Sequence, residues 1–194
     1  MPGVVVGVSG GVDSSVAVHL LKEQGFDVEG VIFKQVNAPS CDTDTMCCSA
    51  SAIEEAREVC RQLKIPLHIK DLRDIFDKAI IQPAIASFAQ GKTPSPCTSC
   101  NSKVRSVTLN YVRQVLGLEY FATGHYFDVS PSDGIVSRGL DSNKDQSYMV
   151  SLVSKDYFKH WLAPLGKYQK SEIRTIAANL GLITATNPDS QDLC

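Results

Sequence analysis

Short apolar runs rich in β-branched residues alternate along the chain with segments whose apolar residues recur every three or four positions. A strand buried on both faces gives a continuous apolar run, whereas an amphipathic helix gives the longer repeat. The apolar runs predict strands over residues 4–8, 26–33, 66–70 and 120–124, with a short fifth strand over 135–138. The helical spacing predicts helices over about 16–24, 51–63, 72–90 and 101–116, and two or three more within 146–180.

This alternation predicts an α/β fold: a doubly wound, mostly parallel sheet flanked by helices, followed by a helical C-terminal segment. Pro83 is expected to kink or break the helix over 72–90, and residues 184–194 are expected to form a loop. Ligands of such sheets bind at the carboxyl ends of the strands. The loop after the first strand, the loop over 91–101 and the turn at Gly124 should therefore lie at that edge.

The composition narrows the class of protein. A chain of 194 residues with 43% hydrophobic and 21% charged residues is ordinary for a globular domain. The net charge of -2 argues against a wholesale polyanion binder but not against a local basic patch. With no membrane-spanning apolar run and no leader pattern, we expect a cytoplasmic protein without a membrane partner. In that compartment, the seven cysteines are expected to be free, catalytic or metal-bound.

A glycine-rich turn, Ser-Gly-Gly-Val-Asp-Ser at residues 9–14, lies between the first predicted strand and the first predicted helix. Glycine lets the backbone approach an anion, and the helix N-terminus supplies N–H donors. The turn lacks the Lys-[Ser/Thr] pair of a Walker A loop and the glycine spacing of a Rossmann fingerprint. Asp13 would repel a bare phosphate but suits a magnesium–pyrophosphate. The turn predicts a phosphate site; the alternative is a tight turn with an Asp or Ser helix cap.

The turn at 9–14 resembles the pyrophosphate loop (PP-loop) of the ATP pyrophosphatases, which cleave ATP between its α and β phosphates. Further segments resemble the tRNA-specific 2-thiouridylases (MnmA/TrmU); they cover residues 47–49, 91–101, 122–126, 143–148, 164–166 and 189–194. The resemblance implies an adenine-nucleotide alpha-hydrolase-like fold. Residues 1–140 would form the PP-loop ATP-binding catalytic domain. Residues 141–194 would form a helical segment and cysteine-bearing tail, at the start of a further region absent from this chain.

The resemblance implies ATP-dependent thiolation at C2 of the wobble uridine of tRNA, with ATP converted to AMP and diphosphate. ATP and Mg²⁺ would be required, and the partners would be the tRNA anticodon region and a sulfur-donor protein, either a cysteine desulfurase or a relay. One alternative is an ATP pyrophosphatase that adenylates a small molecule or another RNA base. A second is a nucleotide-binding domain without activity, against which the intact loop and the paired cysteines argue.

Thiolation by this route needs two cysteines, because one carries a persulfide and the other releases its sulfur by forming a disulfide. The resemblance assigns the nucleophile to Cys100 and the persulfide to Cys194. Cys97 stands where one branch of the family carries an acidic acid/base residue, and we include it among the catalytic candidates. The alternative for Cys97, Cys100 and Cys194 is to hold a [4Fe–4S] cluster with one open iron.

The resemblance also assigns binding residues. Those for ATP are Gly7, Val8, Ser9, Gly10, Gly11, Val12, Asp13, Ser14, Phe33 and Gly124, with Asp13 meeting Mg²⁺ through the pyrophosphate. Those for tRNA are Ser95, Pro96, Cys97, Lys144, Asp145 and Gln146. The competing interpretation of Phe33 is a core aromatic residue, and that of residues 144–146 is a solvated helix start.

Three other features admit both a functional and a structural interpretation. Residues 91–118 contain Lys92, Lys103, Arg105 and Arg113 and no acidic residue, which suits RNA phosphates or an ordinary basic helix face. His125 is either a ligand-facing residue or a hydrogen-bonded turn histidine. Cys60 lies on an apolar helix stripe and is expected in the core. Cys47 and Cys48 are interpreted as structural, and Cys41 has no assigned role.

Overall fold

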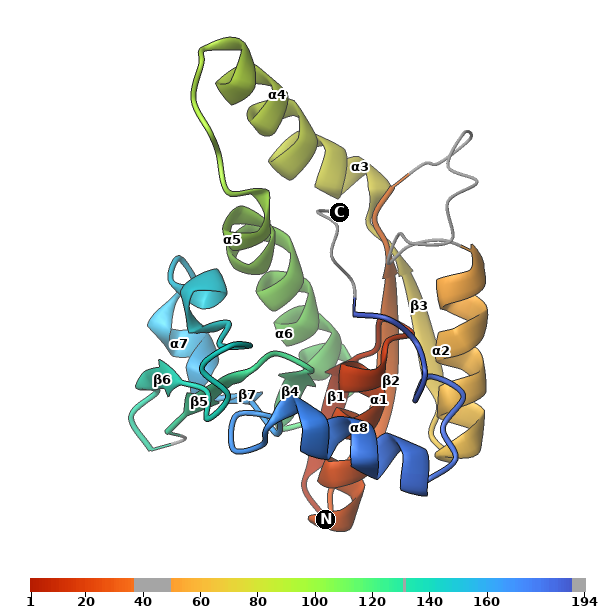
Figure 1. The fold of residues 1–194 in the computed structure, drawn as a ribbon. Coiled ribbons are helices and arrows are strands. Elements are labelled where there is room, and N and C mark those ends of the chain that lie inside the picture. The colour runs from red at the N-terminus through yellow and green to blue at the C-terminus, as the bar shows by residue number, and fades with distance from the viewer. Residues whose placement is uncertain (37–49, 131, 190–194) are drawn as a thin grey trace.

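The computed structural model describes residues 1–36, 50–130 and 132–189. At its centre is a parallel sheet with the strand order β3-β2-β1-β4-β7 (Figure 1). The strands are β1 (Gly3–Gly7), β2 (Asp27–Lys34), β3 (Leu67–Asp71), β4 (Tyr120–Thr123) and β7 (Trp161–Leu162). The chain builds outward from β1 in one direction and then in the other, so the doubly wound parallel fold predicted from the sequence is confirmed.

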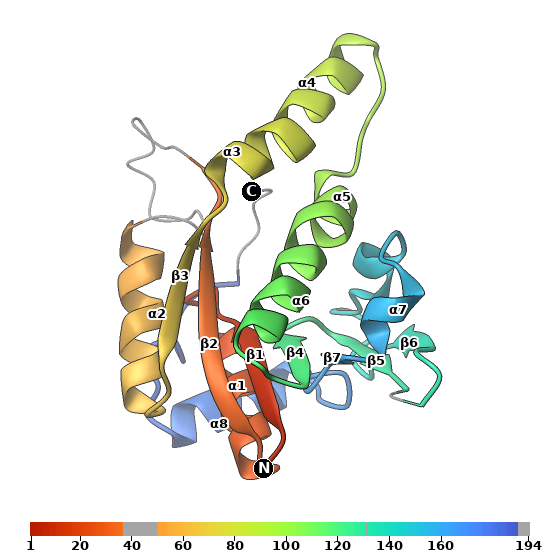
Figure 2. The same ribbon diagram turned by 180° about the vertical axis from the view of Figure 1, so that it is seen from behind.

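Helices cover both faces of the sheet. On one face lie α1 (Val12–Glu23), α2 (Ala50–Gln62) and α8 (Lys170–Asn179), and on the other lies α6 (Ser106–Val115). Figure 2 shows α6 in front of the sheet and α1 and α8 behind it. Successive side chains of β1 point to opposite faces, so Val4 and Val6 join one buried cluster while Val5 joins the other.

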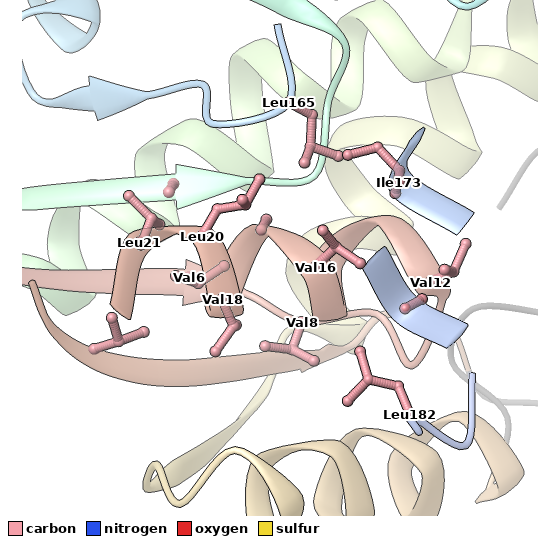
Figure 3. Close-up of a cluster of buried hydrophobic side chains, with 14 of the residues drawn as sticks. Val6, Val8, Val12, Val16, Val18, Leu20, Leu21, Leu165, Ile173 and Leu182 are labelled. Atoms are coloured by element: carbon pink, nitrogen blue, oxygen red, sulfur yellow. The ribbon is translucent and has the colours of Figure 1, made fainter. Parts of the chain in front are cut away.

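The cluster beneath α1 holds this helix against the sheet. Val12 and Val16 of α1 lie among Val8, Ile173 of α8 and Leu182 (Figure 3). Val16 and Ile173 are fully buried. Burying such side chains contributes about 1.5–3 kcal/mol each, so the packing fixes α1 and α8 relative to β1.

Two long helical segments on the other face each contain a π-helical turn. The first joins α3 (Arg73–Phe76), a π turn (Asp77–Ile81) and α4 (Gln82–Ala89). The second joins α5 (Pro96–Cys100), a π turn (Asn101–Arg105) and α6. The helix is therefore interrupted just before Pro83, near the predicted break, because proline lacks the N–H that a regular α-helix needs there. In Figures 1 and 2, α4 projects away from the sheet.

The segment after residue 124 departs most from the prediction. β6 (Val136–Arg138) exists, but it pairs antiparallel with β5 (Phe127–Val129), outside the main sheet. The expectation that 146–180 is helical is only partly right, because the segment holds a 3₁₀ turn (Ser147–Val150), α7 (Lys155–Phe158), β7 and α8. β5 and β7 have only three and two residues, and the sequence pattern predicted neither of them. Within the described residues, no helix is long and apolar enough to cross a membrane.

Candidate nucleotide and thiol site

The turn between β1 and α1 is built from close backbone approaches. Gly10 has a φ of 81°, and a Cβ there would lie 2.7 Å from the carbonyl oxygen of Ala52. A Cβ on Gly124 would lie 2.7 Å from the backbone nitrogen of Ser14. Only glycine fits both positions. The structure therefore brings the turn after β4 against the first turn of α1, as the sheet topology predicts.

The N-terminus of α1 keeps backbone donors available. The first helical bond runs from Ser15 N to Gly11 O at 3.2 Å, so the three preceding N–H groups have no acceptor inside the helix. The hydroxyls of Ser14 and Ser15 also donate to Gly11 O, at 3.1 and 2.9 Å, and the N-cap Gly11 provides no side-chain cap. The structure therefore has the tight turn but not the Asp or Ser cap of the alternative interpretation, and phosphate binding at this helix N-terminus stays a prediction.

Asp13, in the first turn of α1, is held by two groups that the sequence reasoning missed. Lys170 Nζ lies 2.6 and 2.7 Å from its two carboxylate oxygens, and the Tyr126 hydroxyl donates to one of them at 2.6 Å. Burial, and then the charge of Asp13, raise the pKa of Tyr126 far above its usual value. Lys170 is the first residue of α8, where the helix dipole disfavours a cation. That unfavourable position is the one signal in the sequence that could have identified Lys170 as a residue with an acidic partner.

A second carboxylate, Asp189, accepts hydrogen bonds from several cations. Lys144 Nζ lies at 2.7 Å and an Arg174 guanidinium nitrogen at 2.6 Å, while Lys170 Nζ lies at 2.9 Å from the same carboxylate. Burial opposes ionisation, but the hydrogen bonds from Lys144 and Lys170 outweigh it and hold the pKa of Asp189 well below its usual range. Lys170 thus bridges Asp13 and Asp189, which makes one continuous ionic network from the phosphate loop to the C-terminal segment.

The two described cysteines of the candidate thiol set lie on α5. Their i, i+3 spacing places them on one side of the helix. Cys100 is 6% exposed, and the Gln35 amide nitrogen donates to its sulfur at 3.6 Å. Because Gln35 directly follows β2, Cys100 lies at the carboxyl end of β2, next to the strand that leads into the phosphate loop. Cys97 is partly exposed, and its carbonyl oxygen accepts from Asn101 at 3.1 Å.

A family model described as "tRNA methyl transferase HUP domain" matches residues 2–194. The chain belongs to this family. Relatives of the HUP-domain chain are named tRNA-specific 2-thiouridylase MnmA. One, from Clostridium botulinum (strain Eklund 17B / Type B), is 41% identical over 98% of this chain and 54% of the relative. Another, from Thermosynechococcus vestitus, is 44% identical over 100% of this chain and 52% of the relative. The predicted resemblance is confirmed, and the chain spans about half the length of these relatives.

Solved structures share the fold of this HUP domain. A 4-thiouridine synthetase in complex with RNA and ATP has a TM-score of 0.66 at 20% identity, covering 100% of this chain and 44% of that one. The NAD+ synthetase of Acinetobacter baumannii has a TM-score of 0.63 at 17% identity, covering 96% and 32%. The U34-tRNA thiolase NcsA of Methanococcus maripaludis, with its [4Fe-4S] cluster, has a TM-score of 0.57 at 23% identity, covering 100% and 61%. At these identities the likeness concerns the fold alone.

Several predicted site residues of the HUP domain have structural contacts. Phe33 is 8% exposed and packs in the same cluster as Cys100. The Ser95 and Thr98 hydroxyls share a hydrogen bond. Asp145 accepts from Gly139 N at 3.0 Å, and the Gln146 side-chain oxygen accepts from Tyr126 N at 3.0 Å. Their roles toward ATP and tRNA remain predictions.

Other predictions have mixed outcomes. Cys60 is 2% exposed, and burial raises the pKa of its thiol to about 11, which agrees with a core role. Cys41, Cys47, Cys48 and Cys194 lie outside the described residues, so their assignments stay predictions. Among the described residues there is no group of three His, Cys, Asp or Glu placed to hold a metal ion. The cluster alternative also needs Cys194 and is therefore untested.

His125 has the surroundings of a buried turn histidine. It is 7% exposed, its Nδ1 is hydrogen-bonded to the Thr123 hydroxyl at 2.8 Å, and its ring lies near those of Phe127 and Trp161. Burial, and then the charge of Arg105, lower its pKa to about 3. The imidazole is therefore neutral in the folded protein at physiological pH.

The basic residues of 91–118 do not form one patch. Lys92 and Lys103 are exposed near the start of the second helical segment. Arg113 lies in the last turn of α6, where its guanidinium donates to the Asn110 side chain at 2.8 Å and to Leu118 O at 3.4 Å. A helix rises about 1.5 Å per residue, so Arg113 lies about 15 Å further along the axis than Lys103. Only the first part of this segment adjoins the helix that carries Cys97 and Cys100.

Proposed function

We propose that this chain is the ATP-handling part of a tRNA uridine 2-sulfurtransferase. It would bind ATP with Mg²⁺, transfer adenylate to the C2 carbonyl oxygen of the wobble uridine and replace that oxygen with sulfur. The observation that carries the proposal is the juxtaposition of an uncapped helix N-terminus after β1 with the Cys97–Cys100 helix, which Gln35 joins to the end of the adjacent β2. The relatives' names supply the substrate, and the paired cysteines supply the chemistry.

The residues at the loop fit a magnesium–nucleotide. The backbone N–H groups of the first turn of α1 would bind the phosphates, and Asp13 would face the metal. Mg²⁺ neutralises phosphate charge when it is bound. Lys170 gives Asp13 a counter-charge in the folded protein and holds its carboxylate in place at the loop. Phe33 lies near the carboxyl end of β2, Gly124 directly follows β4, and both would contact the adenine through their backbones.

Sulfur transfer follows from the poor leaving group on C2. Adenylation converts the C2 oxygen into part of AMP, which can leave. The terminal sulfur of a Cys194 persulfide, loaded by a sulfur-donor protein, would attack C2 and expel AMP. The Cys100 thiolate would then attack the Cys194 sulfur, so a Cys100–Cys194 disulfide forms and the transferred sulfur remains on C2. An external thiol reductant would return both cysteines to the reduced state.

The test is a reconstituted reaction with ATP, Mg²⁺, a persulfide donor and unmodified tRNA, followed by digestion and quantification of AMP and 2-thiouridine. The proposal expects both products, and expects Cys100→Ser to abolish 2-thiouridine. Cys60→Ala is the control, because it removes a buried thiol that packs in a different core cluster from Cys100, and it should retain activity. AMP release by the unaltered chain without thiolated nucleoside would refute the proposal.

The same preparation, purified without oxygen, decides between the persulfide and the cluster. Iron and acid-labile sulfide are measured beside activity. A colourless, iron-free and active protein supports the persulfide. Activity that tracks bound iron and disappears on chelation would instead assign Cys97, Cys100 and Cys194 to a [4Fe–4S] cluster.

A further inference from the structure

The Tyr126 side chain is buried in the core cluster beneath α1, yet its hydroxyl reaches the phosphate loop. Tyr126 is 2% exposed, and its hydroxyl lies 2.6 Å from Asp13 Oδ1. Lys170 Nζ lies over the face of the same ring, 5.7 Å from its centre, and 2.6 Å from the same carboxylate oxygen. A tyrosine hydroxyl and a lysine ammonium therefore meet Asp13 together, at the first turn of α1.

The backbone of Tyr126 is fixed by contacts that do not involve Asp13. Its N–H donates to Gln146 Oε1 at 3.0 Å, and its carbonyl oxygen accepts from Gln146 N at 2.7 Å. The chain also passes closely at Gly139, where a Cβ would lie 3.0 Å from the Tyr126 carbonyl oxygen. Because the backbone is held at both its donor and its acceptor, the hydroxyl is presented to Asp13 from a fixed position.

The two carboxylate oxygens of Asp13 are used unequally. Each oxygen of a carboxylate offers about two lone pairs to donors or metal ions. Oδ1 accepts from both the Tyr126 hydroxyl and Lys170 Nζ, each at 2.6 Å. Among the described contacts, Oδ2 accepts only from Lys170 Nζ, at 2.7 Å. The Asp13 side chain is 33% exposed, so a ligand can still reach the carboxylate, and Oδ2 is the oxygen with a lone pair to offer.

We propose that Tyr126 is a positioning residue for the metal: by filling Oδ1, its hydroxyl holds the Asp13 carboxylate so that Oδ2 faces the Mg²⁺ of the bound nucleotide. The inference rests on the proposed function, in which Asp13 faces that metal. Mg²⁺ demands near-ideal octahedral geometry and is therefore sensitive to the orientation of its ligands. Without the hydroxyl, Lys170 alone holds the carboxylate, which is then freer to turn about its Cβ–Cγ bond. Metal-dependent binding should weaken, whereas the backbone N–H donors of α1 are unchanged.

The experiment compares Tyr126→Phe with Tyr111→Phe, which removes the same oxygen from a tyrosine of α6 that is 59% exposed. Calorimetry measures the Kd of α,β-methylene ATP, which cannot be cleaved between these phosphates, in Mg²⁺ and in EDTA. The gain in affinity from Mg²⁺ should fall about fivefold in Tyr126→Phe, the effect of one hydrogen bond, while the Kd in EDTA stays within twofold. Tyr111→Phe should match the unaltered chain. An unchanged gain, or an equal loss of affinity in both solutions, would overturn the proposal.

Taking the gain within each chain cancels any general loss of folded protein, because that loss lowers both affinities alike. The second readout is the Mg²⁺ concentration that gives half-maximal AMP formation with tRNA and saturating ATP. It should rise about fivefold in Tyr126→Phe and stay unchanged in Tyr111→Phe. A lower rate at every Mg²⁺ concentration, without that rise, would contradict the positioning role, as would an unaltered chain that gains no affinity from Mg²⁺. The expected loss of gain in a chain that never thiolates tRNA would instead contradict the proposed function alone.

Discussion

Cys60 and Cys100 are both buried, but the polarity of their neighbours differs. Cys60 packs among apolar side chains of the α1 face, and burial alone raises its pKa to about 11. Cys100 receives a hydrogen bond from the Gln35 amide. The two sulfurs therefore have different surroundings despite similar exposure, because one packs among apolar side chains and the other meets an amide donor. Helical spacing identified the first thiol as a core residue, but the contact of the second spans 65 positions of the chain.

His125 predicts a pH-dependent stability. Its folded pKa of about 3 lies below the usual value of 6.5, so between these values the unfolded chain binds a proton that the folded chain does not. Stability from this residue is complete above pH 6.5 and decreases as the pH falls toward 3. Between pH 7 and pH 5 the loss should be about 2 kcal/mol. Urea unfolding of the unaltered chain and of His125→Gln at both pH values measures it.

The comparison between the two chains removes the contribution of other titrating groups. The variant should lose about 2 kcal/mol less than the unaltered chain over the same interval, whatever its absolute stability. Equal losses in both chains would show that the imidazole is protonated in the folded state, and that the Thr123 bond tolerates its charge.

At the scale of elements, the helical segment from α3 to α4 changes from buried to exposed along its length. Phe76 in α3 is 1% exposed and belongs to the core cluster, whereas Phe88 in α4 is 56% exposed. No residue of α4 is buried, and the helix projects from the sheet in both views (Figures 1 and 2). The apolar residues Ile85 and Phe88 therefore contribute little to the stability of this domain.

The two phenylalanines form a matched pair for a stability measurement. Phe76→Ala removes a ring from a packed core and should cost about 3–5 kcal/mol of the free energy of unfolding. Phe88→Ala removes the same ring from a solvent-exposed helix and should change that free energy by less than about 0.5 kcal/mol. Chemical unfolding of both variants checks the difference. A loss above about 2 kcal/mol for Phe88→Ala would mean that α4 packs against the body of the protein.

The elements that the sequence predicted share strong, long patterns. The apolar runs of β1, β2 and β4 reflect burial on both faces of the sheet, and the apolar spacing in α2 and α6 reflects burial of one helix face. Both are local signals. β7 has only two residues, and its place beside β4 depends on Trp161 packing against Phe121 at a ring distance of 5.1 Å. Such a strand is specified by tertiary packing, so no local pattern could predict it.

At the scale of the whole molecule, the charged groups of the site come from opposite ends of the chain. Asp13 and Lys170 are separated by 157 positions and meet because α8 packs on α1. The resemblance located the phosphate loop and the cysteine helix from contiguous motifs. It could not show that Lys170 and Asp189 complete an ionic network there, because neither a motif nor a charge run marks a contact between distant segments.

The distribution of basic residues predicts which of them determine RNA affinity, given the proposed function. Lys92 and Lys103 are exposed, whereas Arg113 is tied to Leu118 O at the far end of α6, and burial lowers its pKa. Each cation that neutralises a phosphate contributes about 0.7–0.9 to the slope of log K against log salt. The double variant Lys92→Ala with Lys103→Ala should therefore reduce the slope for tRNA binding by about 1.5, and Arg113→Ala should leave it unchanged. Fluorescence anisotropy titrations at several salt concentrations measure both slopes. An Arg113→Ala slope reduced as much as that of the lysine variant would place the RNA along the whole helix rather than at its cysteine-bearing start.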